Sequence, residues 1–185
     1  MSRLTIDGYG QVELNQVAFR RDGRIEAQCK PNFTDFSQKV LENGMLLAID
    51  NVAREVKLPV ADETLPIALN YTAEHMYDER KGGLKDFYLK GTDDFYPRLG
   101  YLAVGDKFTT NCVSYDSSVY ATQSAFVSAL NGVAAASVTL YGGIGTDGAI
   151  AVATTAPTVG PVLKVVKKTT MPDGQLGIKF QVVKD

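Results

Sequence analysis

The fold class is decided by the closing stretch Met171-Pro172-Asp173-Gly174-Gln175-Leu176-Gly177-Ile178-Lys179-Phe180-Gln181-Val182-Val183. Its Pro-Asp-Gly portion is a turn sequence, and an apolar run at 162–166 precedes it. After the turn, apolar and polar residues alternate. The residues of the apolar face are Leu176, Ile178, Phe180 and Val182, and those of the polar face include Lys179 and Gln181. The stretch therefore predicts a β-hairpin whose last strand has one buried and one solvated face.

Turn and strand signals recur along the rest of the chain. Seventeen glycines and seven prolines among 185 residues separate short apolar runs, which favours many short strands over long helices. Two further hairpins are expected, one pairing Val12–Phe19 with Arg24–Cys29 and one pairing Met45–Ile49 with Val52–Leu58. Other expected strands are Ile67–Tyr71, Lys107–Val113 and the apolar runs at 137–141, 149–153 and 162–166. Helices are expected at 35–43, capped by Asp35, and from caps at 116–118 to Asn131, ended by Gly132.

These patterns predict a mainly β protein of the α+β type, with short antiparallel sheets or a small β-barrel or sandwich and one or two short helices. The expected divisions are an amino-terminal β-hairpin region with a short helix at 1–70, an aromatic-rich irregular connection at 71–106, and a carboxy-terminal β region with one helix at 107–185. A single compact domain is the alternative, since a chain of this length with 45% hydrophobic residues can bury one core.

The balance of acidic and basic residues indicates no polyanionic partner. Nineteen Lys and Arg residues stand against 21 Asp and Glu residues, so we expect binding to neither nucleic acid nor membrane. The start of the chain lacks the long apolar core of a signal peptide, and no run of about 18 apolar residues follows. We expect the protein to be made and kept in a cytoplasm.

No motif predicts catalysis. The string Gly143-Ile144-Gly145-Thr146-Asp147-Gly148 matches a dinucleotide-binding pattern, but the following residues 149–155 read as a strand where a helix is required, so a glycine-rich hairpin is expected. The single histidine, His75, lies among carboxylates without a nucleophile motif or a metal-ligand spacing. Cys29 and Cys112 are expected to be buried thiols. We therefore expect no enzyme activity, no catalytic residues, no cofactor and no metal.

Aromatic residues are concentrated between positions 71 and 101. The segment has five basic and six acidic residues, and such a balance does not suit stacking against a phosphate backbone. A protein interface is preferred, because Tyr and Arg favour interface centres. The candidate interface residues here are Tyr77, Tyr88, Tyr96, Arg98 and Tyr101. The alternative is a soluble carbohydrate-binding module that uses Tyr77, Tyr88 and Tyr96 as stacking surfaces.

A long neutral segment suggests a second contact region. Between Ser117 and Leu163 the only charged residue is Asp147. Such a segment supplies few charges to keep molecules apart, so we expect a neighbouring subunit to cover part of it. Tyr141 and Ile144 are its candidate interface residues.

Three stretches carry a resemblance to a known class of proteins. They are Val12-Glu13-Leu14-Asn15-Gln16-Val17-Ala18-Phe19-Arg20-Arg21-Asp22-Gly23-Arg24-Ile25-Glu26-Ala27-Gln28, Asn70-Tyr71-Thr72-Ala73-Glu74-His75-Met76-Tyr77-Asp78-Glu79-Arg80 and Phe95-Tyr96-Pro97-Arg98-Leu99-Gly100-Tyr101-Leu102-Ala103-Val104-Gly105-Asp106. With these stretches the chain resembles small virion proteins of tailed bacteriophages, especially phages of Gram-positive hosts.

The resemblance implies a capsid decoration, or cement, protein bound to the outside of a shell built from a major capsid protein. It implies a virion location after synthesis in the host bacterial cytoplasm, with copies of the chain forming a homo-oligomer or held on a lattice. It supplies no catalytic residues. It leaves open whether this chain serves the head, the neck or the tail.

Overall fold

The computed structural model describes residues 1–72 and 96–185, which form two β-sheets and three short helices. The larger sheet has eight strands in the order β1-β10-β12-β11-β13-β14-β9-β2. Their bounds are Ser2–Arg3 (β1), Val12–Gln16 (β2), Lys107–Thr110 (β9), Val113–Tyr115 (β10), Tyr141–Gly143 (β11), Ile150–Ala153 (β12), Val162–Thr170 (β13) and Leu176–Lys184 (β14).

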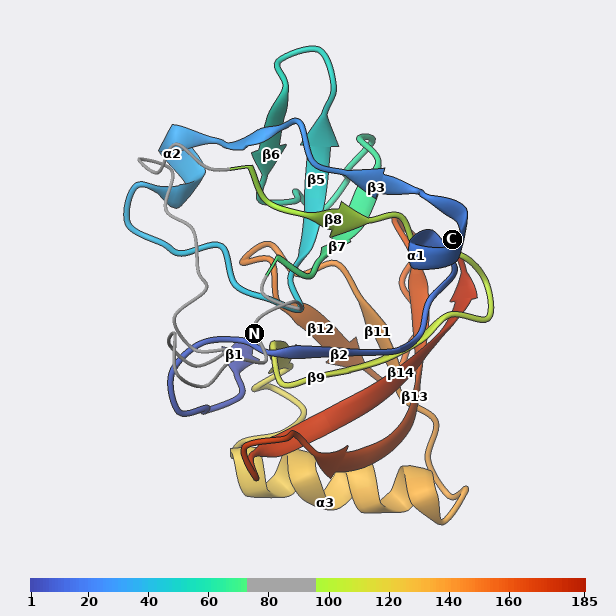
Figure 1. The fold of residues 1–185 in the computed structure, drawn as a ribbon. Coiled ribbons are helices and arrows are strands. Elements are labelled where there is room, and N and C mark those ends of the chain that lie inside the picture. The colour runs from blue at the N-terminus through green and yellow to red at the C-terminus, as the bar shows by residue number, and fades with distance from the viewer. Residues whose placement is uncertain (73–95) are drawn as a thin grey trace.

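The smaller sheet has six strands in the order β3-β8-β7-β5-β6-β4. Their bounds are Ile25–Glu26 (β3), Lys30–Pro31 (β4), Leu46–Asp50 (β5), Glu55–Lys57 (β6), Ile67–Asn70 (β7) and Leu99–Gly100 (β8). The helices are Ala18–Asp22 (α1), Phe33–Phe36 (α2) and Gln123–Ala134 (α3). In Figure 1 the smaller sheet lies above the larger one, and α3 lies below β13 and β14.

The expected mainly β fold of the α+β type is confirmed. The sheets are mixed, because β10 pairs in parallel with β12 and β4 pairs in parallel with β6. The described strands form open sheets and no closed barrel.

The main hydrophobic core joins both sheets and α3. It includes Leu46 and Leu69 from the smaller sheet, Phe180 from the larger sheet, and Phe126 and Leu130 from α3, all with 0% of their surface exposed. Burial of each such side chain contributes about 1.5–3 kcal/mol relative to exposure. The interior thus ties elements from both ends of the chain together.

A second apolar cluster lies on the other side of β5, where successive residues point to opposite faces. Leu47 and Ile49 pack there with Phe36 of α2 and with Leu41. Since β5 is buried on both faces, it reads as the uninterrupted apolar run Met45–Ile49 in the sequence.

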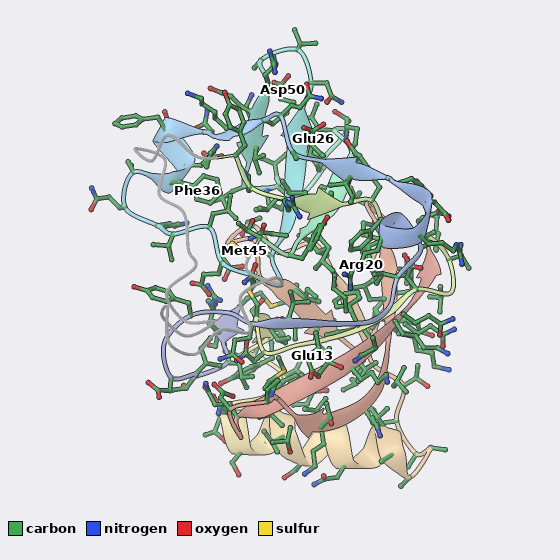
Figure 2. The ribbon with its side chains drawn as sticks, viewed as in Figure 1. Glu13, Arg20, Glu26, Phe36, Met45 and Asp50 are labelled. Carbon is green, nitrogen blue, oxygen red and sulfur yellow. The ribbon has the colours of Figure 1, made fainter. Side chains whose placement is uncertain are left out.

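The carboxy-terminal hairpin is confirmed, with β13 and β14 antiparallel to each other. Phe180 lies opposite Val165 and Phe108, and the rings of Phe108 and Phe180 are 5.8 Å apart. The hairpin at 45–58 is also confirmed, because β5 pairs with β6, and Figure 2 places Asp50 where β5 enters the turn. The glycine-rich string joins β11 to β12 as an antiparallel hairpin, as expected.

The expected amino-terminal hairpin is wrong. β2 pairs with β9 in the larger sheet, whereas β3 pairs with β8 in the smaller one. The chain changes direction between them because residues 18–22 form α1, which buries Phe19 completely and ends at Gly23 with φ 71°. Ile25 is consequently 40% exposed, although Cys29 is buried as expected.

Both expected helices have different bounds. α2 contains only four residues, and Asn32 caps it. The carboxylate of Asp35, the expected cap, instead accepts a hydrogen bond from the N–H of Leu58. α3 begins after Thr122, whose hydroxyl accepts from the N–H of Ala125, and it continues past Gly132 to Ala134. The Asp116 carboxylate accepts from Ser118 in a separate turn.

Candidate protein-interaction surface

Three of the candidate interface residues lie at or beside β8. Tyr96 is 42% exposed, and the Nζ of Lys30 lies 5.5 Å from the centre of its ring, which is a cation–π contact. Arg98 is exposed, and its backbone N–H donates to the hydroxyl of Thr72. Tyr101 is half-buried against the second apolar cluster, where burial and then the Glu26 charge raise its pKa. Only Tyr96 and Arg98 therefore present much side-chain surface.

The other two described candidates belong to the larger sheet. Tyr141 begins β11, opposite Ala153 on one side and Lys164 on the other, and it is half-buried. Ile144 packs against the main core and lies close to Gly160. The candidate residues thus divide between two sheets. Tyr77 and Tyr88, together with the His75 cluster, lie outside the described residues.

The neutral segment 117–163 has two structural parts. Residues 140–163 supply Leu140, Ile150, Val152 and Leu163 to the protein's own core, which accounts for much of the lack of charge in this part. Residues 117–139 are mostly outside the core, and α3 has no charged residue in its first or last turn. The exposed positions of this part are Ser117, Ser118, Val119, Ala121, Thr122, Ser124, Ala125, Ser128, Asn131, Ala134, Ala135, Ala136, Ser137 and Thr139.

We define these exposed residues as the α3 surface. All are uncharged, and most are small. Val119 is 58% exposed at its amino-terminal end. Depletion of charge is characteristic of protein-interface cores.

A charged cavity of about 360 Å³ lies near the amino terminus, and its lining includes Arg3, Lys39, Glu42 and Asp147. The Arg3 guanidinium donates to both carboxylate oxygens of Glu42, at 3.3 and 2.9 Å. The N–H of Gly10 also donates to Glu42, at 2.8 Å. These bonds hold the amino-terminal segment against Glu42. The charges of Arg3 and Glu42 therefore stabilise the fold by pairing with each other.

Asp147 also has a local structural contact. Its carboxylate accepts a hydrogen bond from the N–H of Ala149, 3.2 Å away, within the β11–β12 connection. Within residues 1–72 and 96–185, no group of three or more His, Cys, Asp or Glu side chains is placed to hold a metal ion. The helices of that same part of the chain include none with the length and apolar character needed to cross a membrane.

Both thiols are free and buried, as expected. Burial is the main cause that raises the pKa of Cys112 to about 12, although the Arg3 guanidinium opposes it. Burial, followed by the charge of Glu26, raises the pKa of Cys29 to about 11. Because the thiolate is the nucleophilic form, neither cysteine is equipped for chemistry at neutral pH.

Alkylation at pH 8 should therefore be slow in the folded protein. We expect both cysteines to react at least about a hundredfold more slowly than in denatured protein, because the thiolate fraction and the access of reagent are both reduced. Mass spectrometry of the alkylated peptides would measure each site separately. Rapid labelling of Cys112 in the native state would contradict its buried placement.

Comparison of the chain with protein-family models, with curated proteins and with solved structures gave no match. The α3 surface and the exposed residues beside β8 are therefore characterised by their own geometry.

Proposed function

We propose that this chain is a virion structural protein, a capsid decoration protein that binds the major capsid protein of a tailed bacteriophage and stabilises the head. The α3 surface carries the proposal, because it is an extended, exposed and uncharged surface on a protein that has charged residues elsewhere. The resemblance described above supports the choice of a phage shell as the assembly. Many weak contacts on a symmetric lattice can reinforce a shell together.

Two cavities lie away from the α3 surface. The Arg3–Glu42 cavity has its main charged pair engaged internally. A second cavity, of about 310 Å³, lies between residues 63–67 and the carboxy-terminal residues Lys184 and Asp185.

Electron cryomicroscopy of the native particle would test the proposal directly. We expect density that fits both described sheets on the outer surface of the head. Density in the neck or tail would contradict decoration of the head, and a particle without this chain would contradict a virion role altogether.

A charge placed in the α3 surface should weaken attachment. Ser128 is exposed in the middle of α3, and Ser128→Glu favours the helix while adding a carboxylate to the contact. We expect at least a tenfold loss of occupancy on particles, equivalent to about 1.4 kcal/mol, because the carboxylate would lose water without gaining a partner. Quantitative gel analysis of purified particles would measure occupancy.

The matched control is Gln28→Glu, which makes the same charge change at an exposed position outside the α3 surface. Its occupancy should remain close to that of the unmodified protein. Equal occupancy of the two variants would exclude the α3 surface from the contact.

A further inference from the structure

Four lysines share one face of the larger sheet. In the register of the strands, Lys164 of β13 lies opposite Gln181 of β14, and Gln181 lies opposite Lys107 of β9. In the neighbouring row, Lys167 lies opposite Lys179. Because directly opposite residues point to the same side of a sheet, these four side chains form one group, which we call the lysine face.

The lysine face is turned away from the core. Phe180 and Val165, which alternate with these positions along β14 and β13, are buried in the main core, whereas Lys164 and Lys167 are exposed. Lys107 and Lys179 are half-buried, as expected for long side chains that lie along a sheet.

A β-bulge creates this arrangement. The register shifts between Val165 and Lys167, so Val166 is an extra residue in β13 and Lys167 returns to the face of Lys164. Regular alternation would have placed Lys164 and Lys167 on opposite faces. The bulge therefore places Lys167, in place of Lys168, on this face and directly opposite Lys179, which the sequence pattern does not predict.

The lysine face carries an excess of positive charge among the described residues. Among the residues that the structure describes, none of the four lysines forms an ion pair, and the described ion pairs involve Arg3, Arg21 and Lys57. Lys167 and Lys179 repel each other across the strands. The acidic residue in register with this face is Glu13 on β2 (Figure 2), which lies opposite Thr109 and beyond β9 from Lys179. A carboxylate-bearing partner would relieve the repulsion.

A cavity of about 300 Å³ connects the lysine face to the α3 surface. Lys164, Val166 and Gln181 line it from the strands, Val133 lines it from the end of α3, and Ala136 lines it from the turn that follows. Val166 is 38% exposed. The two surfaces are thus continuous, and an apolar side chain of a partner could enter between them while its neighbouring carboxylates meet the lysines.

We propose that the lysine face docks on a carboxylate-rich surface of the shell protein. This inference rests on the proposed function and names the surface through which it acts. Protein is favoured over nucleic acid as the partner because the face holds only four ammonium groups, with the uncharged Gln181 between Lys164 and Lys107, and because the whole chain has a net charge of −2.

Charge reversal gives the test. The variant Lys164→Glu/Lys179→Glu reverses two charges of the lysine face, and the matched control Lys39→Glu/Lys168→Glu reverses two exposed lysines away from it. Lys168 lies opposite Ile178 and so on the other face of the sheet, and Lys39 lies in the connection between α2 and β5. All four positions lack an ion pair in the described chain, and thermal melts would verify that both variants fold.

Binding of the full chain to purified shells stripped of it would be measured by co-sedimentation at low and moderate salt. We expect the lysine-face variant to bind at least about tenfold more weakly and with a smaller dependence on salt, and the control to bind within about twofold of the unmodified protein. Carbodiimide, which couples amines directly to adjacent carboxylates, should join Lys164 or Lys179 to the shell protein.

The possible failures are distinguishable. If the unmodified chain and the lysine-face variant bind shells equally, the docking surface is wrong and the proposed function remains. If the unmodified chain binds no shell, both are wrong. Crosslinks from these lysines to a second copy of this chain, or retention on the particle's DNA in place of the shell, would overturn the choice of partner.

Discussion

Phe180→Asp should unfold the protein. Phe180 is completely buried on β14, with Phe108 beside it and the main core around it. Truncation of a buried Phe to Ala alone costs about 3–5 kcal/mol, and Asp adds the cost of burying a carboxylate without a partner. This total approaches the entire stability of many domains, so we expect no cooperative thermal transition and loss of the near-ultraviolet circular dichroism signal.

The neighbouring variant Lys179→Ser is the control. Lys179 lies on the opposite face of the same strand, and its removal relieves repulsion with Lys167. Its melting temperature should remain within a few degrees of that of the unmodified protein. If the two variants melted alike, the register assigned to β14 would be wrong.

Gly44→Ala should cause the second large loss of stability. Gly44 has φ 86°, a conformation that costs a residue with a side chain about 1–2 kcal/mol. A Cβ at this position would also lie 2.1 Å from the hydroxyl oxygen of Thr110 and 3.0 Å from the Cβ of Cys112. Both neighbours are buried, and such overpacking adds about 1–3 kcal/mol. We expect a combined loss of about 2–5 kcal/mol in urea unfolding.

Gly105→Ala separates the two causes. Gly105 has φ 96°, but a Cβ there would meet no atom within 4 Å. This variant should lose only the conformational part, about 1–2 kcal/mol. If both substitutions gave the same loss, the contact between Gly44 and Thr110 would contribute nothing measurable.

The sequence predicted local pairings better than distant ones. The β13–β14 and β5–β6 hairpins were predictable because their turns and alternating residues lie within one short stretch. The partner of β2 was not, because β9 lies some ninety residues further along the chain and an adjacent apolar run offered a simpler pairing. The sequence also did not predict the short helix α1, at which the chain passes from the larger sheet to the smaller one.

The interaction surfaces were only partly predictable. The lack of charge in 117–163 was visible in the sequence, but the structure divides that segment into a buried part and the α3 surface. The lysine face was missed because it depends on the bulge at Val166 and on the pairing of β14 with β9. Tyr101 was proposed for an interface, yet it packs largely against the protein's own core.

The strand order has a consequence for synthesis on the ribosome. β14, which follows every other described strand in the sequence, lies between β13 and β9, and β9 in turn pairs with β2, which precedes it by some ninety residues. The larger sheet therefore cannot be continuous until translation has passed Lys184. The Gln11 side chain donates to Asp173, and the Gln175 side chain exchanges hydrogen bonds with the backbone of Asp7, so the β13–β14 turn is held to the amino-terminal segment. β2 is therefore synthesised long before the strand that completes its sheet.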